Sequence, residues 1–275
     1  MDILNNPFRG NGLGDPALAD APFPSTDAQA PRALLAHCPV AGVTPLAEAP
    51  DLAAQAGVGA ILLKDERRRM GLGSFQALGA AYVIAHDAEQ GLAAGRTYMT
   101  ASAGNHGLSV AAGAAAFGAK SVIYLSRHVP ESFAQRLRDL GAGVRREGDD
   151  YEASMQAAEA AASAEGAVLL SDSSWVEYFE RPHRLMAGHL VLMAEVFAQL
   201  KGAPSHIFLQ AGVGGLAGAM AAMARAQWGD SPRIIVVEPA FAPALQASIK
   251  AGRTVIAPGP VSAMGRLDCK EPSLI

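Results

Sequence analysis

Basic tracts, aromatic residues and long apolar runs are all scarce in this 275-residue sequence. Aromatic residues make up 6% of the chain, and the acidic residues outnumber lysine and arginine, so the formal net charge is −4. Because nucleic-acid binding needs clustered positive charge, we expect no nucleic-acid partner. No apolar run reaches membrane-spanning length, and MDILNNPFRG lacks the charged and apolar regions of a signal peptide. These absences predict a cytoplasmic protein without a membrane partner.

Cysteine is equally rare. Cys38 and Cys269 are the only two, and neither belongs to a Cys-x-x-Cys pair. Disulfide frameworks and zinc sites use more cysteines at closer spacing, so both are expected to be reduced thiols. No metal site is predicted.

The sequence does contain a regular alternation of short apolar strands and helical segments from residue 58 onward. Strands are predicted at 58–66, 97–102, 120–125, 141–148, 167–172, 206–210 and 233–239. Helices are predicted from residue 74 and at 105–118, 130–141, 151–166, 181–200, 214–228 and 241–250. This alternation predicts βαβ units and hence an α/β fold with two doubly wound lobes and mostly parallel sheets. Ligands are expected in the crevice beyond the carboxyl ends of the strands.

The two ends of the chain depart from this alternation. Residues 1–31 are rich in Pro, Asp, Asn and Gly without a sustained period, and they are interpreted as an extended arm. Only two clear strands follow residue 205, which makes a thin sheet for a doubly wound lobe. We therefore expect the second lobe to be incomplete.

A glycine loop, LQAGVGGLAGAM at 209–220, lies between a predicted strand and a predicted helix. Backbone N–H groups at such a helix start bind phosphate, and the helix dipole favours its charge. The pattern Gly212-x-Gly214-x-x-Ala217 also fits a dinucleotide fingerprint, and Glu238 ends the next strand near the position of a ribose-binding acid. A phosphate site is therefore predicted, with a nicotinamide-dependent oxidoreductase as one alternative.

A second strand–turn–helix segment, TASAGNHGLSVA at 100–111, carries polar side chains at a helix start. A carboxylate can dock on its N–H groups, and the amide of Asn105 can hydrogen-bond a ring oxygen. His106 is either catalytic or, as is more usual, a capping or core histidine. Asp172 ends the strand 167–172 at the same crevice, where it acts either in chemistry or as a loop cap.

The stretch GLGSFQALGAAY, at 71–82, resembles a device that presents one side chain at the mouth of a pocket. Gly71 and Gly73 form a turn, a helix begins just after them, and the side chain presented is Gln76. The preceding KDERRR, at 64–69, is interpreted for the most part as a solvated charged loop.

Several fragments together are more specific than any one of them: KDE, GLGSF, SAGNHG, DSSW, LQAGVGG, VVEP and LDCKEPS, in this order. The set resembles the fold type II pyridoxal-phosphate enzymes, the superfamily of tryptophan synthase β-subunits, and within it the diaminopropionate ammonia-lyases. The resemblance runs from about Pro31 to the last residue, and the family's C-terminal part is expected to be missing. It implies a large cofactor-binding domain (32–76 and 186–275), a smaller substrate-side domain (77–185) and a homodimer.

The resemblance also implies roles for individual positions. The cofactor phosphate would be held by Gly212, Val213, Gly214 and Gly215. Asn105 would contact the pyridine hydroxyl. The substrate carboxylate would be bordered by Ser102, Gly104 and His106.

Two positions concern the reaction itself. Gln76 stands where the family has the lysine that forms a Schiff base with the cofactor, and an amide nitrogen is not nucleophilic. Asp172 matches one of two carboxylates thought to abstract the α-proton, and Ala103 stands at the other position. The resemblance thus implies pyridoxal phosphate bound non-covalently at best.

Three functions follow from the resemblance. The first is α,β-elimination on a small amino acid such as 2,3-diaminopropionate, giving pyruvate and ammonia, with activity absent or impaired because of Gln76. The second is a catalytically dead homologue that binds a ligand or a partner. The third is a serine/threonine or hydroxyaspartate dehydratase, because SAGNH is similar to the dehydratase form of the motif.

Overall fold

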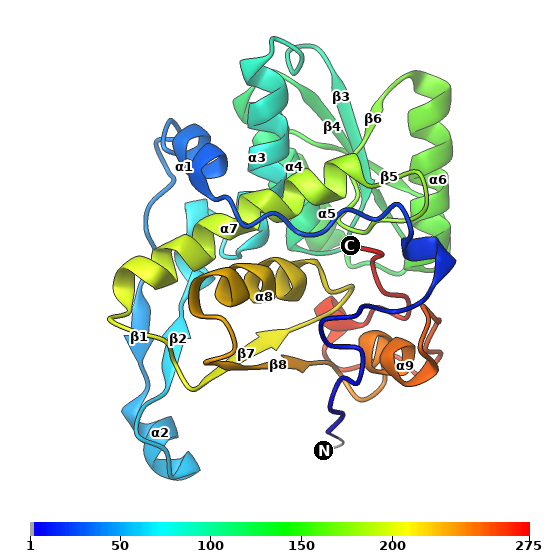
Figure 1. The fold of residues 1–275 in the computed structure, drawn as a ribbon. Coiled ribbons are helices and arrows are strands. Elements are labelled where there is room, and N and C mark those ends of the chain that lie inside the picture. The colour runs from blue at the N-terminus through cyan, green and yellow to red at the C-terminus, as the bar shows by residue number, and fades with distance from the viewer. Residues whose placement is uncertain (1–2) are drawn as a thin grey trace. The chain divides into compact units, whose positions relative to one another are not determined.

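A computed structural model describes residues 3–275, which form two compact units (Figure 1). Unit 1 holds the described residues up to Thr26 together with Ser171–Ala187 and Ala203–Ile275. Unit 2 holds Asp27–Leu170 and Gly188–Gly202. Each unit contains strands and helices, so the predicted α/β class is confirmed.

Unit 2 is built on a parallel sheet of four strands in the order β5-β4-β3-β6. The strands are β3 (Thr97–Ala101), β4 (Lys120–Leu125), β5 (Gly143–Arg146) and β6 (Val168–Leu169). Helices α4 (Asn105–Ala116), α5 (Glu131–Asp139) and α6 (Tyr151–Glu165) connect them in turn. The chain moves to β4 on one side of β3 and to β6 on the other, so the strand order reverses beside β3. In open α/β sheets, this is where ligands bind.

Side chains alternate across β3, as the period of a strand requires. Met99 and Ala101 pack with Tyr124 of β4 against α6. Tyr98 faces the other side and donates a hydrogen bond to Asp87 of α3 (Gln76–Glu89) over 2.8 Å. Helix α3 packs on α4, and Figure 1 shows both on the side of the sheet opposite α6. Both faces of the parallel sheet are thus covered by helices.

The long helix α7 (Glu180–Gln199) lies partly in unit 2, from Gly188 onward. A Cβ atom on Gly188 would lie 2.5 Å from the Leu78 carbonyl oxygen. Only glycine therefore allows the helix backbones of α7 and α3 to approach this closely.

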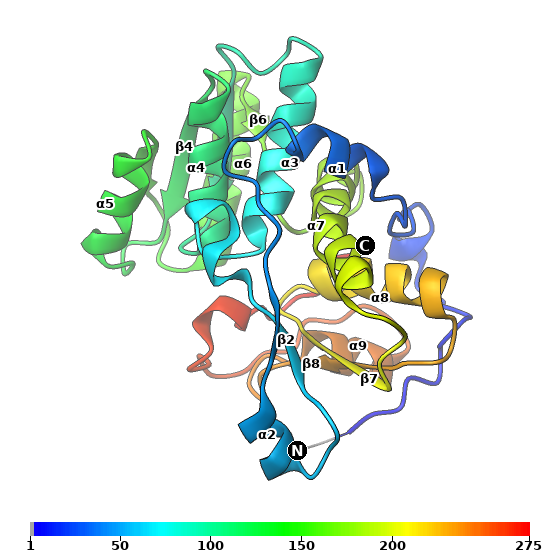
Figure 2. The same cartoon turned by 90° about the vertical axis from the view of Figure 1, so that its left-hand side faces the viewer.

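An antiparallel hairpin is the main departure from the predicted elements of unit 2. Strand β1 (Leu46–Glu48) pairs with β2 (Leu62–Lys64), and α2 (Pro50–Ala56) connects them at the far end (Figure 2). The predicted strand at 58–66 is thus shorter and antiparallel. Leu62 and Leu63 are both exposed, so this strand lacks the buried face that the apolar run suggested.

Unit 1 contains a parallel pair, β7 (His206–Gln210) and β8 (Arg233–Val237), with α8 (Gly215–Trp228) between them and α9 (Ala244–Ala251) after them. The N-terminal arm is tied to this unit. The Asp15 carboxylate accepts hydrogen bonds from Ala17 N–H in the short helix η1 (Pro16–Leu18) and from Thr254 N–H. Part of the segment predicted as an arm instead forms α1 (Gln29–Leu35), which packs on α3 in unit 2.

The two units divide the chain differently from the predicted domains. Residues 171–185, predicted in the smaller domain, lie in unit 1, and residues 188–202, predicted in the large domain, lie in unit 2. Residues 32–76 lie in unit 2, whereas the prediction grouped them with 186–275. The physical reason is that α1 packs on α3 and that Lys64 and Arg69 form ion pairs with Glu195 of α7.

Cys38 and Cys269 form no disulfide in the structure. Across residues 3–275, the structure has no helix with the length and apolar character to cross a membrane. Within the same range, no group of three or more potential His, Cys, Asp or Glu ligands is placed to hold a metal ion.

Candidate functional site

The glycine loop of unit 1 has the geometry of a phosphate cradle. It connects β7 to α8, and Gly214 caps the helix with φ of 108°, a conformation that favours glycine. Gly214 has no side chain that could cap this helix start, so the first N–H groups of α8 are directed toward the loop. A Cβ atom on Gly212 would lie 3.0 Å from Cys269 Sγ, and one on Gly214 would lie 3.3 Å from a Leu245 methyl group. The loop therefore fits an anion such as the phosphate of a cofactor.

Glu238, the candidate ribose-binding acid, has a different role. Its two carboxylate oxygens accept hydrogen bonds from the backbone N–H groups of Leu245 at 2.7 Å and Gln246 at 2.9 Å. Burial raises the pKa of Glu238, and these two hydrogen bonds oppose the rise. Because the carboxylate caps α9, it does not serve as a ribose acceptor. The nicotinamide alternative thus loses one of its two supporting features.

The loop that carries Asp172 is joined to the glycine loop within unit 1. Ser273 N–H donates to the Val213 carbonyl oxygen over 2.9 Å, and Ser273 Oγ accepts from Ser174 N–H, also over 2.9 Å. The hydroxyl groups of Ser174 and Ser273 lie 2.7 Å apart. Asp172 itself is half-buried, two residues before Ser174. Ser273, to which the sequence assigned no role, fixes the spacing between the phosphate cradle and the loop of the candidate base.

In unit 2, the SAGNHG loop joins β3 to α4. Gly104 caps α4 in an extended conformation, and its own N–H donates to Ser102 Oγ over 3.2 Å. A Cβ atom on Gly107 would lie 2.8 Å from the Ser102 carbonyl oxygen, so the loop folds tightly onto the first helical turn. Gly104 has no side chain that could cap this helix, which leaves its N-terminus suited to a carboxylate.

His106 points into the interior of unit 2 rather than toward a substrate. Its side chain is buried, and Nε2 hydrogen-bonds the Leu170 carbonyl oxygen over 2.8 Å. The side chain of His106 is therefore that of a core histidine, the second of the two predicted alternatives. The contact of His106 with a substrate carboxylate stays a prediction.

The turn before Gln76 contains positive φ angles, as its glycines suggested. Met70, Gly71 and Gly73 have φ of 48°, 70° and 78°, and the chain then enters α3 at Gln76. The Gln76 N–H lies 3.3 Å from Ser74 Oγ, and its side chain is half-buried. Residue 76 thus lies at the start of a helix, and its presentation to a pocket stays a prediction.

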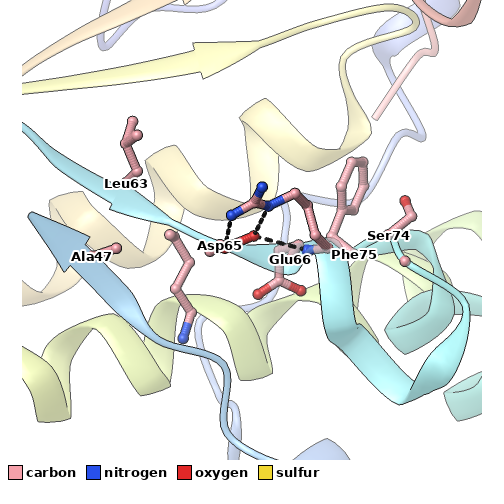
Figure 3. A pocket seen from close by; sticks show the side chains of 9 residues that line it. Ala47, Leu63, Asp65, Glu66, Ser74 and Phe75 are labelled. Carbon is pink, nitrogen blue, oxygen red and sulfur yellow. Dashed lines mark hydrogen bonds and ion pairs between the residues drawn. The ribbon is translucent and has the colours of Figure 1, made fainter. Parts of the chain in front are cut away.

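A cavity of about 500 Å³ lies beside this turn (Figure 3). It lies between the hairpin residues Ala47 and Leu63 and the turn residues Ser74 and Phe75, with polar groups from residues 64–67. The Asp65 carboxylate caps the short helix η2 (Glu66–Gly71) through Arg67 N–H. It also binds the Arg67 guanidinium, and these hydrogen bonds lower the pKa of Asp65 to about 2.

In unit 2, no other lysine takes the place of the Schiff-base lysine that the family has at position 76. The chain has five lysines, and Lys64 is the one that lines the cavity beside the turn. Its ammonium group donates to the Thr44 carbonyl oxygen and to Glu195 Oε2, each over 2.6 Å. The Lys64 side chain is therefore engaged in a buried ion pair and a backbone hydrogen bond. The residues thus fit the phosphate of a cofactor but not its covalent attachment.

Three features together are typical of one class of enzyme. They are the α/β fold, the glycine loop after β7 and the glycine-rich turn before residue 76. The chain belongs to the family of pyridoxal-phosphate dependent enzymes, whose model matches residues 38–275. Pyridoxal 5'-phosphate is the cofactor of this family, and the predicted fold type is confirmed.

The relatives indicate a narrower group. The chain is 33% identical to the diaminopropionate ammonia-lyase of Salmonella typhimurium over 85% of this chain and 65% of that enzyme. It resembles the crystal structure of the Escherichia coli diaminopropionate ammonia-lyase in complex with an aminoacrylate-PLP azomethine reaction intermediate, with a TM-score of 0.88 and 29% identity, over 99% of this chain and 72% of that one. It is also 30% identical to the L-serine dehydratase/L-threonine deaminase of Mus musculus, over 78% of this chain and 62% of that enzyme.

Proposed function

We propose that the chain is a pyridoxal-phosphate lyase scaffold of the diaminopropionate ammonia-lyase type, with its covalent chemistry disabled at residue 76. The natural substrate class is a small amino acid with an amine on its β-carbon, and the products are pyruvate and ammonia. The observation that carries the proposal is a glycine cradle that fits the cofactor phosphate, in the same chain as a presenting turn that ends in glutamine.

Each candidate residue has a part in this proposal. Bound pyridoxal phosphate supplies an electron sink for the carbanion formed when the α-proton leaves. The glycine loop holds the phosphate, and Asn105 hydrogen-bonds the ring hydroxyl. The N-terminus of α4, with Ser102 and Gly104, binds the substrate carboxylate. Asp172 takes the α-proton as general base. Gln76 supplies neither the amine for attachment nor a base for proton transfer.

Cofactor binding without attachment is directly testable. Calorimetry with pyridoxal phosphate should show binding by the unmodified chain and a loss of at least about tenfold in affinity for Gly214→Val. The branched side chain is strained at a φ of 108° and meets Leu245. Gly202→Val, at an open position outside the loop, is the control. Equal affinity in all three chains would remove the glycine loop from the proposal.

The proposal also predicts the handedness of turnover once a lysine is restored at residue 76. Ala103 occupies the position of a second carboxylate, so Asp172 is left as the base on one side of the substrate. A Gln76→Lys chain should therefore prefer one enantiomer of 2,3-diaminopropionate, the L form, by at least about tenfold in kcat/KM. Similar rates for both enantiomers would contradict the role of Asp172 as the single base.

A dehydratase is the second candidate, and the similarity to the mouse L-serine dehydratase/L-threonine deaminase favours it. The Gln76→Lys chain distinguishes the two when its keto-acid production is measured with 2,3-diaminopropionate, serine, threonine and hydroxyaspartate in parallel. A catalytically dead ligand-binding protein is the third candidate, favoured by Gln76 itself. It predicts calorimetric binding of an amino acid or cofactor but no turnover even after Gln76→Lys. A homodimer in the cytoplasm belongs to the lyase proposal.

A further inference from the structure

Arg69 is the most deeply buried charged residue of the KDERRR segment, which was predicted to be for the most part a solvated loop. Arg67 and Arg68 are exposed, whereas the Arg69 side chain is 1% exposed. The burial of Arg69 has a physical cause. A guanidinium enters a protein interior only when its donors are satisfied and its charge is neutralised, and Arg69 meets both conditions.

The hydrogen bonds of Arg69 converge from three parts of unit 2. Nε donates to Glu66 Oε2 over 2.7 Å, and Nη1 donates to Glu195 Oε1 and to the Gly42 carbonyl oxygen, each over 2.8 Å. Nη2 donates to Glu195 Oε2 over 2.7 Å, to Glu66 Oε1 over 2.8 Å and to Thr44 Oγ1 over 2.9 Å. The planar fork thus binds both carboxylates bidentately, a geometry that lysine cannot reproduce.

The group is balanced in charge. Lys64 pairs with Glu195 over 2.6 Å, so two cations face the two carboxylates of Glu66 and Glu195. Burial opposes the charge on Arg69, but the hydrogen bonds to Glu195 and Glu66 outweigh this effect and raise its pKa. We call Lys64, Glu66, Arg69 and Glu195 the buried ion cluster.

The turn that presents residue 76 begins at this cluster. The carbonyl oxygen of Arg69 accepts hydrogen bonds from the N–H groups of Leu72 at 3.0 Å and Gly73 at 3.3 Å. Met70, directly after Arg69, has φ of 48°, a conformation that costs on the order of 1 kcal/mol for a residue other than glycine. A strained turn of this kind persists only when its surroundings hold it in place.

Helix α7 also contacts the other end of the turn. The ring of His189 meets the ring of Phe75 edge to face, with centroids 5.2 Å apart. Gly188 allows α7 to contact the Leu78 carbonyl oxygen at the start of α3. Residues 69–78 are therefore fixed to α7 at both ends, by the Glu195 ion pair at one end and by packing at the other.

We infer that Arg69 is a positioning residue: through its bidentate pairing with Glu195 and Glu66 it clamps the turn 70–76 and thereby fixes the side chain at position 76. The inference rests on the proposed function for its consequence in chemistry, because in that proposal position 76 is where a lysine would attach the cofactor. The clamp itself is a property of the unmodified chain.

Two measurements test the inference, with Arg69→Lys as the main variant because it keeps the charge and loses the fork. The first is hydrogen exchange of the unmodified chain and of Arg69→Lys. Amide exchange in peptides covering 70–78 should accelerate at least tenfold in the variant, while peptides covering 97–125 stay unchanged. Arg145→Lys is the matched control, since Arg145 also pairs bidentately with a carboxylate, Glu165, but on the surface of unit 2. If Arg69→Lys does not fold, Glu195→Gln replaces it, with the same expected exchange.

The second measurement uses the Gln76→Lys background and the rate of covalent adduct formation with pyridoxal phosphate. Adding Arg69→Lys should slow this rate at least tenfold while the calorimetric affinity for the cofactor changes less than twofold, and Arg145→Lys should leave both unchanged. Unchanged exchange at 70–78, or an unchanged adduct rate, would overturn the inference. Failure of Gln76→Lys alone to form an adduct would instead contradict the proposed function, and hydrogen exchange would then decide the inference by itself.

Discussion

Gln76→Lys should convert a chain that forms no covalent adduct with pyridoxal phosphate into one that forms it stoichiometrically and turns over 2,3-diaminopropionate. The side chain at position 76 begins α3 after a turn clamped by the buried ion cluster, so an introduced amine starts from a fixed position. General acid–base catalysis is worth about 10²–10⁴ in rate. Pyruvate production, followed spectrophotometrically, should therefore rise at least about a hundredfold above the unmodified chain.

The matched control is Gln90→Lys, which places the same substitution just after the last turn of α3, at an exposed residue. It should give neither adduct nor turnover. A lysine in the first turn of a helix opposes the helix dipole and costs about 0.5 kcal/mol, so Gln76→Lys should remain folded. A folded Gln76→Lys chain that binds the cofactor without forming an adduct would show that the defect lies beyond residue 76.

Acid should destabilise the fold through His189, and this is the second large effect. The ring is buried against Phe75, and neither ring nitrogen has a hydrogen-bond partner among the described residues. Burial, with a smaller contribution from nearby His106, lowers the pKa of His189 from 6.5 to about 3. A depressed histidine pKa means that the unfolded chain takes up a proton that the folded chain refuses. Stability is therefore fully present above pH 6.5 and is lost as the pH falls toward 3, by about 1.4 kcal/mol for each pH unit.

His189→Leu isolates this effect because leucine removes the titrating ring and keeps an apolar side chain in the interior. Urea unfolding at pH 7, 6, 5 and 4.5 should show that the unmodified chain loses stability relative to His189→Leu, by roughly 2.5 kcal/mol between pH 7 and pH 4.5. Carboxylates such as Glu195 also make the fold acid-sensitive, but both chains share them and the difference cancels them. Exposed His128→Leu is the control. Parallel pH dependences for the unmodified chain and His189→Leu would contradict this account.

The repeated βαβ units were predictable from sequence because each strand is a short apolar run ended by a turn. The boundaries of β3, β4, β7 and α6 differ from the predicted ones by one residue or less. The hairpin of β1 and β2 was not predictable in the same way. Its apolar residues, Leu62 and Leu63, are exposed. The apolar run therefore suggested a buried strand where the structure has an exposed one.

The candidate site divides along similar lines. The glycine loops were predictable because positive φ angles and close backbone approach favour glycine at these positions, as at Gly214 and Gly73. Arg69 was hidden within a run of three arginines, and its burial depends on Glu195, 126 residues further along the chain. Ser273 was hidden for the same reason, because a serine acquires its role only from the distant groups it joins, Val213 and Ser174.

Peptide mapping after borohydride reduction tests the central claim most directly. The unmodified chain and Gln76→Lys are each saturated with pyridoxal phosphate, reduced, weighed intact and digested. The account predicts no adduct on the unmodified chain and a single adduct, within the peptide that contains position 76, on Gln76→Lys. A reduced adduct on any of the five native lysines of the unmodified chain, Lys64 above all, would contradict the claim that Gln76 disables attachment.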